Sequence, residues 1–300
     1  MTRLQANAVL LVATMIWGAT FTVQQMTAPF IGASQFTGSR FLLGALLVLP
    51  LALRQAARKR RDEGWRLTRR HGVMIGLTGV ALFLGAVLQQ IGIAGTTVAN
   101  AGFLTGLYVP LTPLIALMVL RKPPHWAVWP AAAVCLAGVY VLSGGELAAL
   151  TVGDLWVIGG ALFWAIHILL VGTVAQATGA PLVVAVGQFA ACAVLGLGWG
   201  LATEPVAWDL LPRALPGVLF AGLVSVGLGF TLQVVGQRHT PPADAAIILS
   251  AETVFAAITG AIVLGERLSP LELTGCAMIL AGVLSVELLP LWAKGRRRAV

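Results

Sequence analysis

Long apolar runs follow one another along most of the chain, and short polar segments separate them. A helix that crosses a bilayer needs about 20 mostly apolar residues, so each run of that length predicts a transmembrane helix. The predicted helices cover residues 5–26, 34–54, 71–93, 98–119, 126–143, 154–174, 181–201, 211–233, 242–263 and 271–291. The pattern therefore predicts an all-α integral membrane protein with ten transmembrane helices.

The composition indicates that lipid is the main solvent of this chain. Of the 300 residues, 58% are hydrophobic and 10% are charged, whereas about a quarter of a soluble domain is charged. The net charge is +8, but the positive residues lie in short segments between apolar runs rather than over a soluble surface. We therefore expect a lipid bilayer, and no nucleic acid, as a partner. The three cysteines lie inside apolar runs without closely spaced ligands, so no disulfide, metal or other cofactor is predicted.

Basic residues set the direction of the predicted helices, because they concentrate in cytoplasmic connections. They gather after the second, fourth and eighth predicted helices and in the C-terminal tail. These residues are Arg54, Arg58, Lys59, Arg60, Arg61, Arg66, Arg69, Arg70, Arg121, Lys122, Arg238, Lys294, Arg296, Arg297 and Arg298. The alternate connections are nearly free of positive charge and carry acids such as Glu146, Glu204 and Asp209. Both termini are therefore predicted to lie in the cytoplasm, in agreement with an even number of helices.

The two halves of the chain are similar to each other. With an offset of 144 residues, Gln89 aligns with Gln233, together with many glycines and alanines around them. Near the start of each half, Trp17 falls opposite Trp164 with nearly the same offset. Because small and apolar residues match by chance in such sequences, the paired polar and aromatic residues carry most of the weight. The pattern predicts an internal duplication.

The duplication divides the chain into a first repeat at residues 1–146 and a second at residues 147–300. Each repeat has an odd number of helices, so the second repeat enters the membrane in the opposite direction. Inverted repeats of this kind are typical of secondary transporters, which bind substrate near the midplane of the membrane and work by alternating access. A membrane-embedded enzyme would need a constellation of catalytic or metal-binding groups, and the scattered histidines form none.

Several short motifs are similar to those of one transporter family. Residues 252–257 read ETVFAA, residues 264–268 read LGERL, and residues 281–283 read AGV. The Trp-Gly pair at 17–18 and the Ser-Arg-Phe run at 39–41 belong to the same pattern. Over essentially the whole chain, this resembles the EamA branch of the drug/metabolite transporter superfamily, in which a Glu-Pro-hydrophobic step and an LGER motif precede spaced glycines.

The sequence departs from that signature at two places. Thr253 replaces the proline that normally follows the glutamate, and residues 120–123 read LRKP where the first repeat would have LGER. The resemblance implies an exporter of small metabolites in a bacterial inner membrane. Within the family, the chain looks most similar to the YddG-type amino-acid exporters.

Polar side chains inside a membrane mark cavities or helix contacts, because lipid cannot satisfy them. Glu252, near the middle of the predicted ninth helix, is the first candidate. It either contacts a substrate ammonium group or exchanges a proton, or it is a hydrogen-bonded residue that locks helix packing. Tyr108 is its repeat counterpart, and Asn100 shares a helix face with Tyr108. Asn100 aligns with Asp244, which is expected in the first turn of its helix, where an acid suits the helix dipole.

Two midplane tryptophans are the next candidates. Trp17 and Trp164 either wall a cavity and stack on a substrate or pack helices together with their N–H groups satisfied by neighbours. Thr20 and Gln24 extend the face of the first helix that carries Trp17. His167 occupies the position in the second repeat that Thr20 has in the first, and is either a hydrogen-bond donor to substrate or a structural histidine.

Weaker candidates complete the predicted site. Phe83 is an aromatic candidate for the cavity wall. Gln89 and Gln233 either face the cavity or link the third and eighth helices by hydrogen bonds. Arg40 could attract a carboxylate, but Glu266 is predicted at the same side of the membrane as a salt-bridge partner, so the structural interpretation is favoured.

Together these observations predict an exporter of amino acids, either neutral or aromatic ones or a broad range of them, that acts as a monomer without a cofactor. Few charges and several rings suit a neutral zwitterion better than a polyanion. Export of another small solute or of a drug is the alternative, and an embedded enzyme is a distant third.

Overall fold

The computed structural model describes residues 1–96, 98–121, 123–143, 150–263 and 267–298, and this part of the chain contains helices, turns and loops but no β-strand. Eight segments within it are long and apolar enough to cross a membrane, and two further apolar helices are shorter. The eight are Arg3–Phe30, Ala33–Glu63, Arg69–Ile93, Ala101–Val119, Val152–Thr178, Pro181–Thr203, Leu211–Gln237 and Pro242–Val263. The shorter helices, Val128–Leu142 and Pro270–Val286, lie where the fifth and tenth transmembrane helices were predicted.

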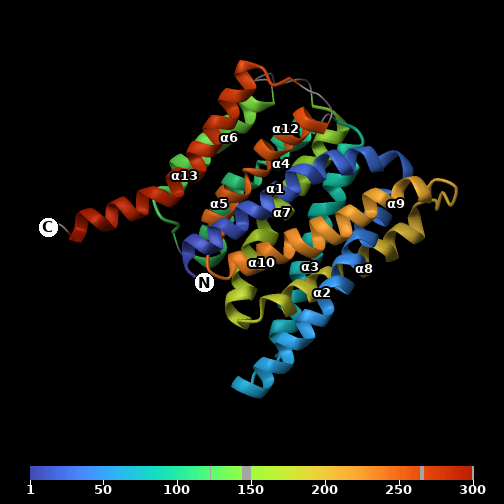
Figure 1. Ribbon diagram of the computed structural model, residues 1–300, viewed down its shortest axis with the longest axis horizontal. Coiled ribbons are helices and arrows are strands. Elements are labelled where there is room, and N and C mark those ends of the chain that lie inside the picture. The colour runs from blue at the N-terminus through green and yellow to red at the C-terminus, as the bar shows by residue number, and fades with distance from the viewer. Residues whose placement is uncertain (97, 122, 144–149, 264–266, 299–300) are drawn as a thin grey trace.

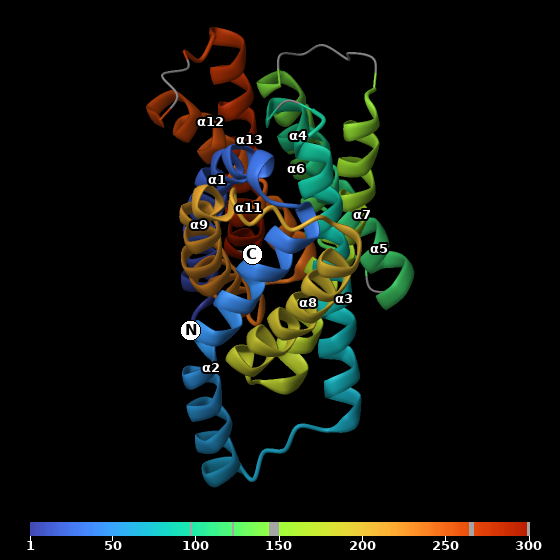
Figure 2. The same ribbon diagram turned by 90° about the vertical axis from the view of Figure 1, so that its right-hand side faces the viewer.

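The helices form one bundle (Figure 1). In chain order the elements are α1 (Arg3–Thr27), η1 (Ala28–Phe30), α2 (Ala33–Glu63), α3 (Arg69–Ile93), α4 (Val98–Thr105), α5 (Tyr108–Leu120), α6 (Val128–Leu142), α7 (Val152–Thr178), α8 (Pro181–Thr203), α9 (Leu211–Leu219), η2 (Phe220–Phe230), α10 (Thr231–Gln237), α11 (Pro242–Leu249), α12 (Glu252–Val263) and α13 (Pro270–Arg298). Figure 2 shows the C-terminal end of α2 extending below the other helices before the chain returns into α3.

Three of the predicted helices are not continuous α-helices, which corrects the sequence-based expectation. The predicted helix 98–119 breaks between α4 and α5, and the predicted helix 242–263 breaks between α11 and α12. The predicted helix 211–233 contains the π-helical stretch η2. The face shared by Asn100 and Tyr108 therefore does not run through one straight helix.

Local chemistry explains the break before α5. Pro110 has no N–H group to donate to the carbonyl of Gly106, and that carbonyl accepts from the N–H of Val109 at 3.0 Å instead. The turn tightens from α-helical to 3₁₀-type hydrogen bonding and the chain changes direction. Tyr108 is thereby placed in the first turn of a new helix.

Hydroxyl groups have the corresponding role before α12. Ser250 Oγ donates to the carbonyl of Ile247 at 2.6 Å, and Thr253 Oγ1 donates to the carbonyl of Ser250 at 2.8 Å. Such bonds satisfy carbonyls that a continuous helix would use for its own backbone. A helix break inside a membrane is tolerated only where its polar groups find partners of this kind. Glu252 becomes the first residue of α12.

Helices α6 and α13 pack closely and run antiparallel along one edge of the bundle (Figure 1). A Cβ atom added to Gly138 would lie 2.9 Å from the backbone N of Ile279. One added to Gly282 would lie 2.4 Å from Cys135 Sγ. The contact between backbones is possible because these positions have no side chain, which is typical of helix packing in lipid.

Polar contacts tie helix ends together at one end of the bundle. Arg3 at the start of α1 forms an ion pair with Asp244 at 2.7 Å, and Asp244 lies in the first turn of α11 as expected. A Cβ atom added to Gly179, between α7 and α8, would lie within 4.0 Å of both Lys59 and Arg238. Basic residues from two connections and the N-terminal helix therefore lie at this end.

Glu204 caps helix α2 from the connection that follows α8. Its carboxylate accepts hydrogen bonds from the backbone N–H groups of Ser34 at 2.8 Å and Gln35 at 3.0 Å. Gly32, the N-cap residue, has no side chain to do this. A carboxylate at a helix N-terminus satisfies free N–H groups and interacts favourably with the helix dipole. It also ties α2 to α8.

We expect Glu204→Ala to lower the free energy of unfolding by about 1–2 kcal/mol. Two backbone N–H groups of α2 would lose their acceptor, and the dipole of α2 would lose the negative charge at its N-terminus. Thermal unfolding of the purified protein in detergent measures the effect. Asp209→Ala is the matched control, since Asp209 is an exposed carboxylate in the same connection. Equal melting temperatures for the two variants would show that the cap contributes nothing.

Candidate functional site

A small cavity lies inside the bundle, between the helix breaks and the middle parts of α1, α3 and α7. The space that the centre of a water molecule can reach is about 50 Å³, and one water needs about 10–15 Å³ of such space. The cavity thus has room for a few waters, and a larger solute requires the helices to separate. Its lining residues are Trp17, Thr20, Phe21, Gln24, Arg40, Gln89, Thr105, Tyr108, Trp164, Ile168, Ser225, Phe230, Gln233, Leu249 and Glu252.

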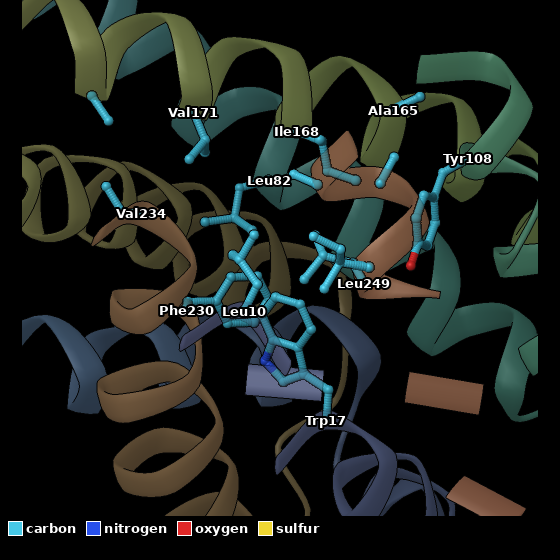
Figure 3. Close-up of a cluster of buried hydrophobic side chains, with 14 of the residues drawn as sticks. Leu10, Trp17, Leu82, Tyr108, Ala165, Ile168, Val171, Phe230, Val234 and Leu249 are labelled. Atoms are coloured by element: carbon cyan, nitrogen blue, oxygen red, sulfur yellow. The ribbon is translucent and has the colours of Figure 1, made fainter. Parts of the chain in front are cut away.

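Tyr108 and Glu252 meet at this cavity. The Tyr108 hydroxyl donates to Glu252 Oε1 at 3.1 Å, and both side chains are buried. Figure 3 shows the hydroxyl of Tyr108 pointing toward the side of the cluster that holds Leu249. The hydrogen bond joins the start of α5 to the start of α12, so the two broken helices are linked where they break.

Aromatic rings form another wall, and Phe230 is at its centre. The Trp17 ring lies 4.6 Å from the Phe230 ring, between centroids (Figure 3). The Trp164 ring lies 5.9 Å away on a nearly parallel plane, tilted by 23°, and the Phe41 ring lies 5.4 Å away edge-on. Phe230 was not predicted. Its repeat counterpart, Ala86, is not aromatic, so the duplication gave no signal for it.

Glutamines fill part of the polar wall. Gln24 Nε2 donates to Gln90 Oε1 at 2.8 Å, which links α1 to α3. Gln89 Nε2 donates to Thr105 Oγ1 at 3.0 Å. The hydrogen bond of Gln89 therefore links α3 to α4 and not to the predicted eighth helix. Both Gln89 and Gln233 line the cavity.

Several buried polar atoms of the lining have no hydrogen-bond partner among the described residues. They are Arg40 Nε, Trp164 Nε1, Ser225 Oγ and Gln233 Oε1. Trp17 Nε1, by contrast, donates to the carbonyl of Ser225 at 3.4 Å. Because an unsatisfied buried polar group costs about 1–3 kcal/mol, such a cluster indicates a place where water or a polar ligand completes the hydrogen bonds.

Most of the residues singled out from the sequence come together around this cavity. Those that line it are Trp17, Thr20, Gln24, Tyr108, Trp164 and Glu252. Thr20 uses its hydroxyl locally, donating to the carbonyl of Ile16 at 2.8 Å.

Two other predicted residues lie elsewhere. His167 is outside the lining, with Nε2 2.9 Å from Gln188 Oε1 and its ring 5.8 Å from that of Trp164. Phe83 packs against the main hydrophobic core and is also outside the lining. The side chain of Asn100 lies outside the described residues. A histidine three residues beyond a cavity-facing tryptophan can still point to a neighbouring helix, which spacing alone did not reveal.

Arg40 lines the cavity, although the sequence-based interpretation assigned it a structural ion pair. Glu266, its expected partner, lies outside the described residues. Within the described part of the chain, no group of three or more His, Cys, Asp or Glu residues could hold a metal ion. The chemistry of the cavity is therefore that of rings, amides, hydroxyls, one acid and one guanidinium.

Comparison with known families decides the class of the protein. The model of the EamA-like transporter family matches twice, over residues 4–144 and 151–288. The chain belongs to the EamA-like transporter family. The expected place in the drug/metabolite transporter superfamily is thereby confirmed, and the chain is a multi-pass membrane protein. The closer likeness to YddG-type exporters stays a prediction.

Named relatives of this EamA-like transporter span nearly its whole length. An uncharacterized transporter of Archaeoglobus fulgidus is 29% identical over 286 residues, which cover 95% of this chain and 87% of the relative. The uncharacterized transporter YwfM of Bacillus subtilis is 27% identical over 93% of both chains. The threonine/homoserine exporter RhtA of Escherichia coli K12 is 28% identical, with 84% of this chain and 81% of the relative covered.

Solved structures share the fold of this EamA-like transporter, and one of them is compared with it. It is described only as the crystal structure of a protein, and it matches with a TM-score of 0.78 over 96% of this chain and 98% of the other. The sequences are 19% identical, so the match shows a common fold and nothing of the solute.

Proposed function

We propose that this transporter exports neutral amino acids across a bacterial inner membrane, acting as a monomer by alternating access. The observation that carries the proposal is the buried cavity, in which unsatisfied donors and acceptors lie beside aromatic rings, one acid and one guanidinium. A small zwitterion with a short side chain offers matching groups. The name of the relative RhtA, a threonine/homoserine exporter, favours the same class of solute.

The proposed architecture is ten transmembrane helices in two inverted repeats, residues 1–146 and 147–300. Contacts in the bundle support it, because they recur between counterpart residues. A Cβ atom added to Gly85 would lie 3.1 Å from the Trp164 ring, and one added to Gly229 would lie 2.9 Å from Trp17 Nε1. Gly85 and Gly229 are counterparts in the two repeats, as are Trp164 and Trp17, so the two contacts are the same contact made once in each direction between the repeats.

A second pair of contacts has the same relation. Thr96 Oγ1 donates to Asp154 Oδ1, and Thr240 Oγ1 donates to Asn7 Oδ1 at 2.6 Å. Thr96 and Thr240 are counterparts with the offset of 144, and Asn7 and Asp154 are counterparts with the offset that relates Trp17 to Trp164. Similar folds in the two halves, packed about a common twofold axis, account for both pairs.

Tyr108 and Glu252 support an axis that passes beside them. They are counterparts separated by 144 residues, and they are hydrogen-bonded to each other. Residues exchanged by a twofold axis touch each other only beside the axis. The antiparallel contact of α6 with α13 supports an axis perpendicular to the helices, which in a bilayer lies in the membrane plane. The cavity is then at the repeat interface, where such transporters bind substrate.

The arrangement of charged ends supports a cytoplasmic location for both termini. Arg3, Lys59 and Arg238 lie at the end of the bundle described above, whereas Asp154 and Glu204 belong to connections of the opposite kind. Cytoplasmic connections are rich in Lys and Arg. Thiol labelling of single cysteines placed beside each terminus would contradict the proposal if either of them were reached from outside.

Transport by purified protein in vesicles tests the function. Vesicles are loaded with unlabelled threonine, and uptake of labelled threonine is followed by exchange. We expect uptake well above that of protein-free vesicles, inhibited by neutral amino acids and not by dicarboxylic acids. A panel that includes cationic drugs distinguishes the alternative solute class. Absence of exchange with every amino acid would remove the proposal.

The two tryptophans are expected to select the solute. Trp17→Phe and Trp164→Phe keep a ring but remove an N–H group and part of the stacking surface, so we expect KM to change about twofold to tenfold and the order of competitors to change. Competition in the exchange assay measures both. Trp129→Phe is the control, because Trp129 is 38% exposed on α6. Identical competition profiles in all three variants would mean that the cavity tryptophans only pack helices.

A further inference from the structure

Arg40 is a buried cation in a place where burial is costly. It lies on α2 within a membrane-spanning segment, and only 2% of its surface is exposed. Arg40 lies in the second turn of α2, and a charged side chain that is buried away from water without a partner is costly. Such a residue is retained when it contacts a counter-charge or faces a polar chamber, and Arg40 lines the cavity.

Two aromatic rings hold the guanidinium in place. Its Cζ atom lies 5.1 Å from the centroid of the Phe36 ring and 5.2 Å from that of Phe41. Cation–π contacts of this kind orient a guanidinium without neutralising its charge. Arg40 is therefore positioned by its neighbours and still needs an anion.

No anion for Arg40 is found in the described part of the chain. None of the ion pairs there includes Arg40, and its Nε atom has no hydrogen-bond acceptor. In a lipid environment an unpaired guanidinium binds carboxylate strongly, because it presents two parallel N–H groups to the two oxygens.

Among the described residues that line the cavity, Glu252 alone has a carboxyl group, and that group accepts from Tyr108 at 3.1 Å. A guanidinium and a carboxyl group in one chamber offer a partner to each end of a zwitterion. On the basis of the proposed function, we infer that Arg40 binds the carboxylate of the transported amino acid, so that a free carboxylate is required for recognition. Glu252 is then the group available to the ammonium end.

Competition with a neutral carboxyl analogue tests this inference. In threoninamide the carboxylate is replaced by an uncharged amide of similar size. In the exchange assay with labelled threonine, we expect threonine to inhibit the wild-type protein about tenfold to a hundredfold better than threoninamide, as one charge-assisted contact predicts. In Arg40→Gln that ratio should fall to about one, because threonine loses affinity and threoninamide does not.

Three variants make the result specific. Arg54→Gln removes an exposed charge from the same helix and should keep the wild-type ratio. Glu252→Gln weakens binding of the ammonium end of the solute, which threonine and threoninamide share, and should also keep the wild-type ratio. Arg40→Lys keeps the positive charge but lacks the two parallel N–H groups of the guanidinium, so an intermediate ratio of threonine to threoninamide inhibition is expected. This variant replaces Arg40→Gln if Arg40→Gln fails to fold.

The outcomes separate the inference from the proposed function. If wild-type vesicles exchange threonine but Arg40→Gln keeps the wild-type ratio of threonine to threoninamide, the carboxylate contact is wrong and amino-acid transport stands. Equal losses for both compounds in Arg40→Lys would also overturn it, since a merely structural role lowers both. If no variant, including the wild type, exchanges any amino acid, the proposed function itself has failed.

Discussion

Glu252→Gln is expected to raise KM for threonine about 10- to 100-fold while the protein stays folded. Glutamine has the size of glutamate and can still accept the hydrogen bond that Tyr108 donates at 3.1 Å. It lacks the negative charge that would bind the solute ammonium group, and a hydrogen bond to a charged group contributes about 1.5–3 kcal/mol. Exchange of labelled threonine in vesicles, together with the melting temperature, measures both parts of the prediction.

Tyr108→Phe and Glu63→Gln are the matched controls for that experiment. Tyr108→Phe removes the hydroxyl that joins the helix breaks and leaves the charge of Glu252, so a purely structural role predicts that it is as harmful as Glu252→Gln. Glu63→Gln removes an exposed carboxylate at the end of α2 and should have no effect. A Glu252→Gln variant with normal flux and normal pH dependence would refute both ammonium binding and proton exchange.

An analogue without the ammonium group sharpens the result. 2,3-Dihydroxybutyrate has a hydroxyl where threonine has its amino group. The wild-type protein should discriminate strongly between the two compounds, and Glu252→Gln should discriminate less, while its preference for a free carboxylate is kept. Loss of both preferences together would indicate that the variant has lost the shape of the cavity.

The long apolar runs located the membrane segments well, because a bilayer requires segments of that length and apolarity. Predicted boundaries such as 181–201 differ by two residues from the observed α8, Pro181–Thr203. The breaks were missed because they depend on a few local hydrogen bonds. Pro110 was visible in the sequence, but the effect of the Ser250 and Thr253 hydroxyls depends on which carbonyls they reach.

The candidate site could be predicted where the duplication and polarity agreed. Trp17, Trp164, Tyr108 and Glu252 are unusual residues at counterpart positions, and all of them line the cavity. Phe230 was missed because a phenylalanine inside an apolar run is indistinguishable from lipid-facing residues without the packing.

Arg40 shows a different limit of the sequence. It was assigned to a structural ion pair because Glu266 was predicted near the same side of the membrane. Depth along a helix is available from the sequence, but the direction in which a long side chain points depends on neighbouring rings. Phe36 and Phe41 supply that information only after folding.

Gly18→Val is expected to destabilise the protein and to remove most of its transport, because Gly18 is where α1 meets α12. A Cβ atom added there would lie 2.5 Å from Phe255 Cβ and 2.6 Å from the backbone N of Ala256. Backbone atoms cannot move aside as a flexible side chain can, so the two helices must separate. Overpacking of this kind costs about 1–3 kcal/mol.

Separation of α1 from α12 also moves both sides of the cavity, because Trp17 precedes Gly18 and Glu252 begins α12. Gly198→Val is the matched control: it places the same side chain in a helix, where a Cβ atom at Gly198 would meet nothing within 4 Å. The difference between the two variants in melting temperature and in threonine exchange therefore isolates the contact between α1 and α12 from helix propensity. If the two variants have the same melting temperature but only Gly18→Val loses exchange, the contact between α1 and α12 positions the site and contributes little to stability. If both also exchange equally, α1 and α12 do not need their close approach, and Trp17 and Glu252 are placed by other contacts.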